Sequence, residues 1–251
     1  MTDAFAGLPR GHYGAILADP PWQFDSLWGG RPKKVGGNYP SRAVDAHYDT
    51  LTTDQIAALP VSELAAEDCV VFMWTCWPVM DKAFAVLQGW EFKYKTCAFS
   101  WMKADPYRLF ADDKTPTAGM GYWTRANTEP CLLATRGKPK RLNADVRQGI
   151  IAPRREHSRK PDGIHERIER LVAGPYLELF ARQKRPGWDV WGNQTDKFAP
   201  VPDPMLIFPP SKEGVKAEAD PYADGWPDAE ANSRGCYDVA IEAMRGKKKC
   251  P

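Results

Sequence analysis

The chain has 251 residues, which is enough for one sizeable α/β domain with an extension. It is 43% hydrophobic and 26% charged, and no apolar run approaches the roughly 18 residues of a membrane span. The formal net charge of +2 neither requires nor excludes a polyanionic partner, so the distribution of charge matters more than its sum.

Short apolar runs alternate with segments of helical periodicity along the first 198 residues. The expected strands cover residues 13–19, 69–74, 92–102, 130–135, 176–180 and 188–192, and the expected helices cover 52–59, 78–89 and 162–172. This alternation favours a mostly parallel sheet with helices on both faces. Two long segments, 23–47 and 103–128, show no clear periodicity. Residues 199–251 read as a Pro-rich linker and a C-terminal extension, with one helix near 228–245.

The cysteines and histidines do not point to a metal site. The six cysteines form no C-x-x-C pair, and the four histidines complete no metal-binding spacing around them. We therefore predict reduced thiols and no bound metal. Residues 1–14 lack the pattern of a signal peptide, so we expect a cytoplasmic protein.

The chemically informative segment is Asp19-Pro20-Pro21-Trp22, which ends the first expected strand. The Asp19 carboxylate and the main-chain carbonyl of Pro20 could each accept a hydrogen bond from one N–H of an amino group. Proline fixes φ and donates no hydrogen bond, so the turn is stiff and presents acceptors. Trp22 could stack on the plane of a nucleobase. The motif therefore predicts a site that positions an exocyclic amino group, with a base in a duplex first flipped out of its stack.

This motif and several later segments resemble the family of the catalytic subunit of the eukaryotic messenger-RNA N6-adenosine methyltransferase. That family has bacterial and phage members thought to act on DNA. The resemblance covers about residues 13–198, and its segments follow in the family's order. Besides the motif they are 47–52, 71–74, 127–133, 157–162, 178–182 and 187–194. Spaced motifs in the right order are more specific than one tetrapeptide.

The resemblance implies an α/β fold of the Rossmann-like type that binds S-adenosylmethionine, with the catalytic motif before the cofactor-binding strand. It implies that Lys160 contacts the methionine end of the cofactor and Arg182 its ribose. Asn193 and Gln194 would contact the ribose and adenine, and Asp19 would lie near both substrates.

Three features leave this assignment open in detail. Relatives commonly have an acidic residue where this sequence has Gly163. Eukaryotic members of the family often have His-Asn where this sequence has Gln-Lys-Arg at residues 183–185. The cofactor contacts near these two positions therefore stay open. Glu178 reads equally well as a structural anchor and as a ligand.

A local excess of positive charge suggests where nucleic acid would bind. Residues 136–160 contain nine Lys or Arg and two acids, a pattern that fits a phosphate-contacting surface and equally an ordinary solvated face. The candidate contacts are Arg31, Lys33, Lys34, Tyr48, Arg125, Asn127, Lys138, Lys140 and Arg141.

These observations predict transfer of a methyl group to the N6 amino group of adenine in DNA, in the cytoplasm of a bacterium or of a phage-infected host. RNA is the first alternative, because the catalytic residues do not distinguish the two nucleic acids. A non-catalytic nucleic-acid-binding subunit is the second. Asp19 and Trp22 argue against methylation of protein glutamine, since those enzymes carry Asn and Tyr there. We expect no membrane association, and the sequence leaves monomer and homodimer open.

Overall fold

The computed structural model describes residues 3–23, 50–103, 123–124, 126–154, 156 and 159–199. All of them belong to one compact unit, residues 1–210. The predicted linker, extension and C-terminal helix lie outside the described residues apart from Ala199, so the boundary near residue 198 remains a prediction. No helix in the described ranges is long and apolar enough to cross a membrane.

The described chain is built around a seven-stranded sheet of order β5-β3-β4-β2-β1-β6-β7. The strands are β1 (Tyr13–Ala18), β2 (Ala65–Trp74), β3 (Lys93–Lys103), β4 (Thr128–Arg136), β5 (Gly149–Ala152), β6 (Tyr176–Leu179) and β7 (Trp188–Trp191).

Six strands run in one direction and β4 runs against them. β1 pairs in parallel with β2 and β6, β6 with β7, and β3 with β5, whereas β4 is antiparallel to both β2 and β3. We call the edge where the six parallel strands end the carboxyl edge, and the opposite one the amino edge. Because β4 is reversed, its first residues lie at the carboxyl edge and its last at the amino edge.

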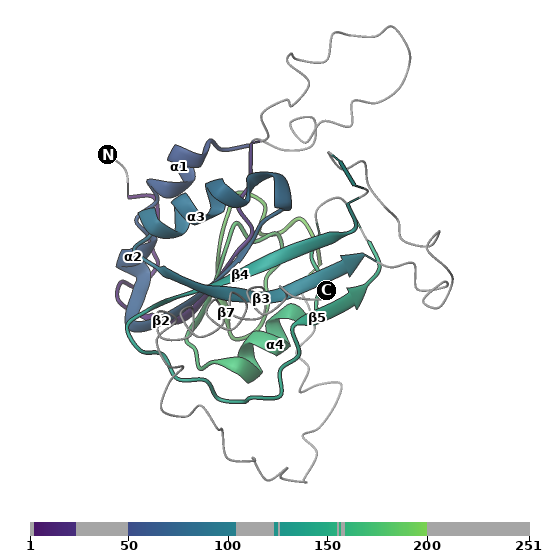
Figure 1. Cartoon of the computed structure of the whole chain (residues 1–251). Helices are drawn as coiled ribbons and strands as arrows, with labels where there is room; N and C mark the ends of the chain where they lie inside the picture. Colours follow the sequence, from purple (N-terminus) through teal and green to yellow (C-terminus); the bar gives the residue numbers. More distant parts are fainter. Residues whose placement is uncertain are drawn as a thin grey trace, which may run out of the picture. The chain divides into compact units, whose positions relative to one another are not determined.

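Helices cover both faces of this sheet (Figure 1). Alternate residues of β1 face opposite sides, so Ile16 and Ala18 join one hydrophobic cluster and Ala15 and Leu17 the other. The first cluster packs against α1 (Thr53–Ala57), α2 (Val61–Leu64) and α3 (Met80–Gly89), and the second against α4 (Ile164–Leu171). The mostly parallel sheet with helices on both faces, predicted from the sequence, is confirmed.

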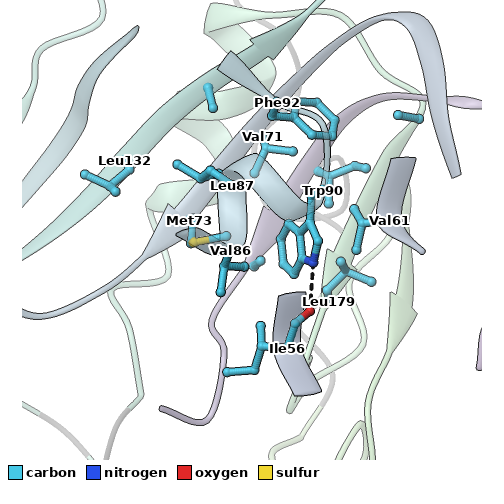
Figure 2. Packing of buried hydrophobic residues seen from close by; sticks show 14 of the residues in the cluster. Ile56, Val61, Val71, Met73, Val86, Leu87, Trp90, Phe92, Leu132 and Leu179 are labelled. Atoms are coloured by element: carbon cyan, nitrogen blue, oxygen red, sulfur yellow. Dashed lines mark hydrogen bonds between the residues drawn. The ribbon is translucent and has the colours of Figure 1, made fainter. Parts of the chain in front are cut away.

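Two polar interactions fix how α1 and α3 meet. Thr52 caps α1: its hydroxyl accepts from the Gln55 backbone N–H, and the Gln55 side chain accepts from the Thr52 N–H. The fully buried Trp90 ends α3 and donates its indole N–H to the carbonyl oxygen of Ile56 at 2.8 Å, as Figure 2 shows. The first cluster therefore buries this large polar ring without leaving its donor unsatisfied.

The predicted strands and helices appear with ends shifted by a few residues, and two short elements are new. The sequence predicted neither α2 nor β5. In β5 only Ile150 is buried, and four residues flanked by polar chain carry too little periodicity to be recognised.

Candidate active site

The Asp-Pro-Pro-Trp motif lies at the carboxyl edge, directly after β1. Backbone hydrogen bonds hold the turn, since Trp22 N–H donates to the Pro20 carbonyl and Leu51 N–H to the Pro21 carbonyl, each at 2.9 Å. The Trp22 indole N–H donates to the carbonyl of Trp74, the last residue of β2, at 3.1 Å. The turn is therefore tied to the neighbouring strand.

The stacking role predicted for Trp22 does not fit its position. The side chain is only 6% exposed and belongs to the hydrophobic cluster under α1 and α3. It anchors the turn instead of offering a ring face to a base. The Pro20 carbonyl already accepts one hydrogen bond, so an amino group would use its second lone pair.

Two cations converge on the Asp19 carboxylate. Lys160 Nζ lies 2.8 Å from Oδ1 and 2.9 Å from Oδ2, and an Arg182 guanidinium nitrogen lies 3.1 Å from Oδ2. The three side chains are 14–16% exposed, so these are largely desolvated ion pairs. The structure thus brings together three of the five residues predicted to bind the cofactor.

A sharp turn after β6 directs Arg182 to this place. Phe180 has φ 61°, a left-handed conformation that costs a non-glycine residue about 1–3 kcal/mol. Its ring packs edge-on against Trp191, with centroids 5.4 Å apart. Packing of this ring helps to hold the unfavourable backbone conformation next to the ion pairs.

Glu129 extends the ionic network and was not among the predicted site residues. It stands second in β4, forms an ion pair with Lys103 and lies 3.5 Å from Lys160 Nζ. Burial favours the neutral carboxyl, but Lys160 and Lys103 outweigh it and hold the pKa of Glu129 below its ordinary value. Burial likewise opposes the charge of Lys160, yet Asp19 and Glu129 raise its pKa above the ordinary value. Both groups are therefore charged at neutral pH.

A pocket opens beside this network, between the ends of β1 and β6 and the start of α4. It encloses about 610 Å³, part of it open to solvent. Cations, carboxylates and aromatic rings line it together, among them Asp19, Trp74, Arg159, Lys160, His165, Glu178, Phe180, Arg182, Arg185 and Phe198. Clefts lined by aromatic side chains and a few convergent polar groups are typical of small-molecule binding sites.

Some polar groups that line the pocket are only partly hydrogen-bonded. His165 Nε2 lies 2.8 Å from Glu178 Oε2, whereas His165 Nδ1 is buried without a hydrogen-bond partner in the described chain. Arg159 Nε is in the same condition, and its guanidinium lies over the Phe198 ring at 4.7 Å from the centroid. Glu178 contacts His165 of α4 and also lines the pocket, so it can serve as a structural anchor and as a ligand.

Thiol chemistry does not suit this site at neutral pH. Cys76 follows β2 at the carboxyl edge, and burial raises its pKa to about 12, which keeps it protonated. Among the described residues, no group of His, Cys, Asp and Glu is arranged to hold a metal ion.

Comparison with protein families matches residues 13–194 to MT-A70. The chain belongs to the MT-A70 family. It is 30% identical over 227 residues to the Type II methyltransferase M.MunI of Mycoplasma sp, covering 85% of this chain and 88% of that protein. It is 29% identical over 194 residues to the human N(6)-adenosine-methyltransferase catalytic subunit METTL3, covering 74% of this chain but 29% of the human protein. An MT-A70-like N(6)-adenosine-methyltransferase of Drosophila melanogaster is 30% identical over 205 residues, with 29% of its length covered.

Membership of MT-A70 makes the chain a methyltransferase with a Rossmann-like fold, as the sequence predicted. The observed sheet agrees, because the catalytic motif follows β1 whereas the pocket also uses the end of β6, a strand that comes later in the chain. The chain spans most of M.MunI but less than a third of the eukaryotic MT-A70 relatives.

The other predicted site residues of this MT-A70 protein that the structure describes do not line the pocket. Asn193 and Gln194 follow β7 at the carboxyl edge but do not line the pocket, and Gln194 accepts a hydrogen bond from Lys197 at 3.1 Å. Asn127 precedes β4 at the same edge, where its carbonyl accepts from the Lys103 N–H. Arg31, Lys33, Lys34, Tyr48 and Arg125 lie outside the described residues.

The basic residues Lys138, Lys140 and Arg141 follow the end of β4 at the amino edge, whereas the Asp-Pro-Pro-Trp motif lies at the carboxyl edge. Arg136, which ends β4, pairs with Cys69, whereas Trp74 at the carboxyl edge pairs with Cys131. Five residue steps of about 3.3 Å separate the two pairs, or roughly 17 Å. These three side chains therefore lie toward the edge opposite Asp19, because the reversed direction of β4 carries the chain away from the site, and their contact with nucleic acid stays a prediction.

Sequence reasoning missed Glu129, Lys103, His165 and Arg185 as site residues. Lys103 ends β3 and Glu129 is the second residue of β4. Charged residues at the ends of strands were the feature of the sequence that could have pointed to them. The role of Glu129 depends on β4 running antiparallel, because only then does the start of β4 lie at the same edge as Asp19 and the end of β3.

Proposed function

We propose that this chain transfers a methyl group from S-adenosylmethionine to the exocyclic N6 amino group of adenine in DNA. The observation that carries the proposal is the Asp19 carboxylate, which lines the pocket, is held by Lys160 and Arg182, and is followed by the rigid Pro-Pro turn. An acceptor placed beside a ligand pocket is what transfer to an amino group requires.

The pocket residues fit S-adenosylmethionine chemically. Lys160 can bind the carboxylate of the methionine end, whereas Arg182 can donate to sugar hydroxyls and Glu178 can accept from them. The buried Nδ1 of His165 and Nε of Arg159 offer hydrogen-bonding capacity that the described chain leaves unused. Phe180 and Phe198 supply apolar surface.

The bound cofactor would supply the methyl group, which leaves its sulfonium sulfur as the adenine amino nitrogen forms the new N–C bond and releases one proton to solvent. Asp19 would accept a hydrogen bond from one amino N–H and the Pro20 carbonyl from the other, aiming the nitrogen lone pair at the pocket. Lys160 and Glu129 would keep the Asp19 carboxylate oriented. Positioning and fixed charge would carry most of the rate increase.

The choice of DNA is supported by the similarity to the Type II methyltransferase M.MunI, which is 30% identical over 85% of this chain and 88% of that protein. The similarity to the N(6)-adenosine-methyltransferases makes RNA the second candidate.

A labelled-transfer assay tests reaction and substrate together. Label from S-adenosylmethionine is offered to double-stranded DNA, single-stranded DNA and RNA, and the nucleosides are then separated. We expect label in N6-methyldeoxyadenosine, and about a 100- to 1,000-fold slower rate for Asp19→Ala. Asp145→Ala, which removes an exposed carboxylate at the amino edge, is the matched control and should transfer normally.

The possible outcomes separate the candidates. Label confined to an RNA nucleoside would retain the chemistry and replace the substrate. No label in any nucleic acid, from protein that binds S-adenosylmethionine, would refute the proposed acceptor. Undiminished transfer by folded Asp19→Ala would refute the role of the motif.

A further inference from the structure

Trp77 is a large aromatic residue that is exposed to solvent at the carboxyl edge of the sheet. It begins the short 3-10 helix η2 (Trp77–Val79), just after β2 ends, and is 55% exposed. Its indole N–H donates to Thr128 Oγ1 at 2.9 Å. The hydrogen bond satisfies the polar edge of the ring and fixes its orientation, so its apolar face is presented to solvent.

Two further exposed apolar side chains continue from Trp77 across the sheet. Met102 of β3 lies opposite Thr128 in the antiparallel register, and Ile151 of β5 lies opposite Met102. Met102 is 45% exposed and Ile151 60%. Directly paired residues point to the same face of a sheet, so Trp77, Met102 and Ile151 form one exposed apolar strip along the carboxyl edge.

The strip begins close to the reaction centre. Thr128, which holds the Trp77 ring, precedes Glu129 in β4, and Glu129 lies 3.5 Å from Lys160 Nζ, which is bonded to Asp19. Cys76, the neighbour of Trp77, is close enough to Glu129, Lys160 and Asp19 for their charges to influence its thiol. The exposed aromatic ring therefore lies at the same edge of the sheet as the carboxylate that would receive the target amine.

We propose that Trp77 is a stacking platform for an unpaired base of the substrate, and that Met102 and Ile151 extend the platform along the strand. The inference rests on the proposed function, because it takes the substrate to be nucleic acid. A base taken out of its stack loses neighbours, and an aromatic ring on the protein can replace them. Trp22 and Trp74 cannot do so in this structure, since they are 6% and 1% exposed.

Direct binding to oligonucleotides tests the proposal without requiring turnover. The probes are a fluorescently labelled single-stranded DNA and the matching duplex, titrated with full-length wild type, Trp77→Ala and Trp77→Phe over a range of salt concentrations. Tyr94→Ala is the matched control, because Tyr94 is 41% exposed on β3 but lies near the amino edge, opposite Ala134.

We expect Trp77→Ala to weaken binding of single-stranded DNA roughly 5- to 150-fold, the range of one lost base–aromatic stack. The slope of log affinity against log salt should not change, because no phosphate contact is removed. Trp77→Phe should recover most of the affinity, Tyr94→Ala should match wild type, and S-adenosylmethionine affinity should be unaltered throughout. Thermal unfolding near the wild-type midpoint would establish that the exposed substitution leaves the fold intact.

Three outcomes would overturn the assignment. Wild-type affinity in folded Trp77→Ala would remove the platform while leaving the proposed function standing. A change of oligomeric state in Trp77→Ala, with unchanged DNA affinity per subunit, would make the strip an interface between copies of the chain. No binding of any nucleic acid by wild type would refute the proposed function itself, and the platform with it.

Discussion

The two edges of the sheet carry similar charges in very different surroundings. At the carboxyl edge, Lys160, Arg182 and Glu129 are 14–21% exposed and are bonded to one another or to Asp19. At the amino edge, the ion pair of Arg170 with Asp145 is 61% and 67% exposed. Exposed pairs contribute at most about 1 kcal/mol, whereas desolvated charges interact strongly and are costly to leave unpaired. The number of basic residues therefore does not locate a site, but their burial and pairing do.

The largest effect should come from Trp22, which anchors the Asp-Pro-Pro-Trp turn. Trp22→Ala removes a buried ring and its hydrogen bond to Trp74, so we expect the free energy of unfolding to fall by about 3–5 kcal/mol. Urea denaturation measures the change. Trp77→Ala, the exposed counterpart, should change stability by less than about 0.5 kcal/mol. Equal losses for the two variants would contradict the burial assigned to Trp22.

The next effect concerns Lys160, a largely buried cation that lines the pocket. Lys160→Ala removes a group proposed to bind the cofactor's carboxylate, so we expect the Kd for S-adenosylmethionine to rise ~10- to 100-fold. Titration calorimetry on the folded variant measures it. Lys93→Ala, an exposed lysine at the amino edge, should bind like wild type. If the affinity of Lys160→Ala were unchanged, the lysine would serve only to neutralise Asp19 and Glu129.

Glu129 gives the carboxyl edge a predictable response to acid. Its pKa is held below the ordinary value of 4.5, so its stabilising contribution is present above the unfolded-state pKa and is lost as the pH falls through the folded-state value. Glu129→Gln should lower the free energy of unfolding by roughly 1–3 kcal/mol at pH 7. The variant should also lose less stability than wild type when the pH falls below 4.5.

Urea titrations at neutral and acid pH measure the free energy of unfolding of Glu129→Gln and its loss of stability on acidification. The control is Glu63→Gln, because Glu63 is 61% exposed and lies 3.6 Å from Arg10. It should show a change below about 1 kcal/mol. A variant at Glu129 that keeps the full acid sensitivity of wild type would show that other carboxyl groups govern acid unfolding.

The smallest effect is expected at the amino edge. Replacing Lys138, Lys140 and Arg141 together by alanine should change the methyl-transfer rate less than about two-fold and stability by about 0.5 kcal/mol or less, since all three are exposed. The transfer assay and binding at several salt concentrations measure this. A marked loss of DNA affinity with a shallower salt slope would restore these residues to a nucleic-acid surface distant from the catalytic motif.

The sequence alone determined the class of fold and the chemistry at its centre. Apolar runs alternating with helical segments specify a mostly parallel sheet, because strand and helix periods are local properties of the chain. The Asp-Pro-Pro-Trp motif, with Lys160 and Arg182 in the family's order, identified three side chains that the structure joins by ion pairs.

Only the tertiary structure decided which side chains share an edge and which are covered. The apolar run of β4 marks a buried strand but does not specify its direction, so the sequence could not show that Glu129 reaches Lys160 while Lys138 moves away from it. The motif likewise could not show that the Trp22 ring turns into the core and leaves Trp77 in the open. Burial and strand direction are set by contacts between segments far apart in the chain. Local residue patterns do not specify these contacts.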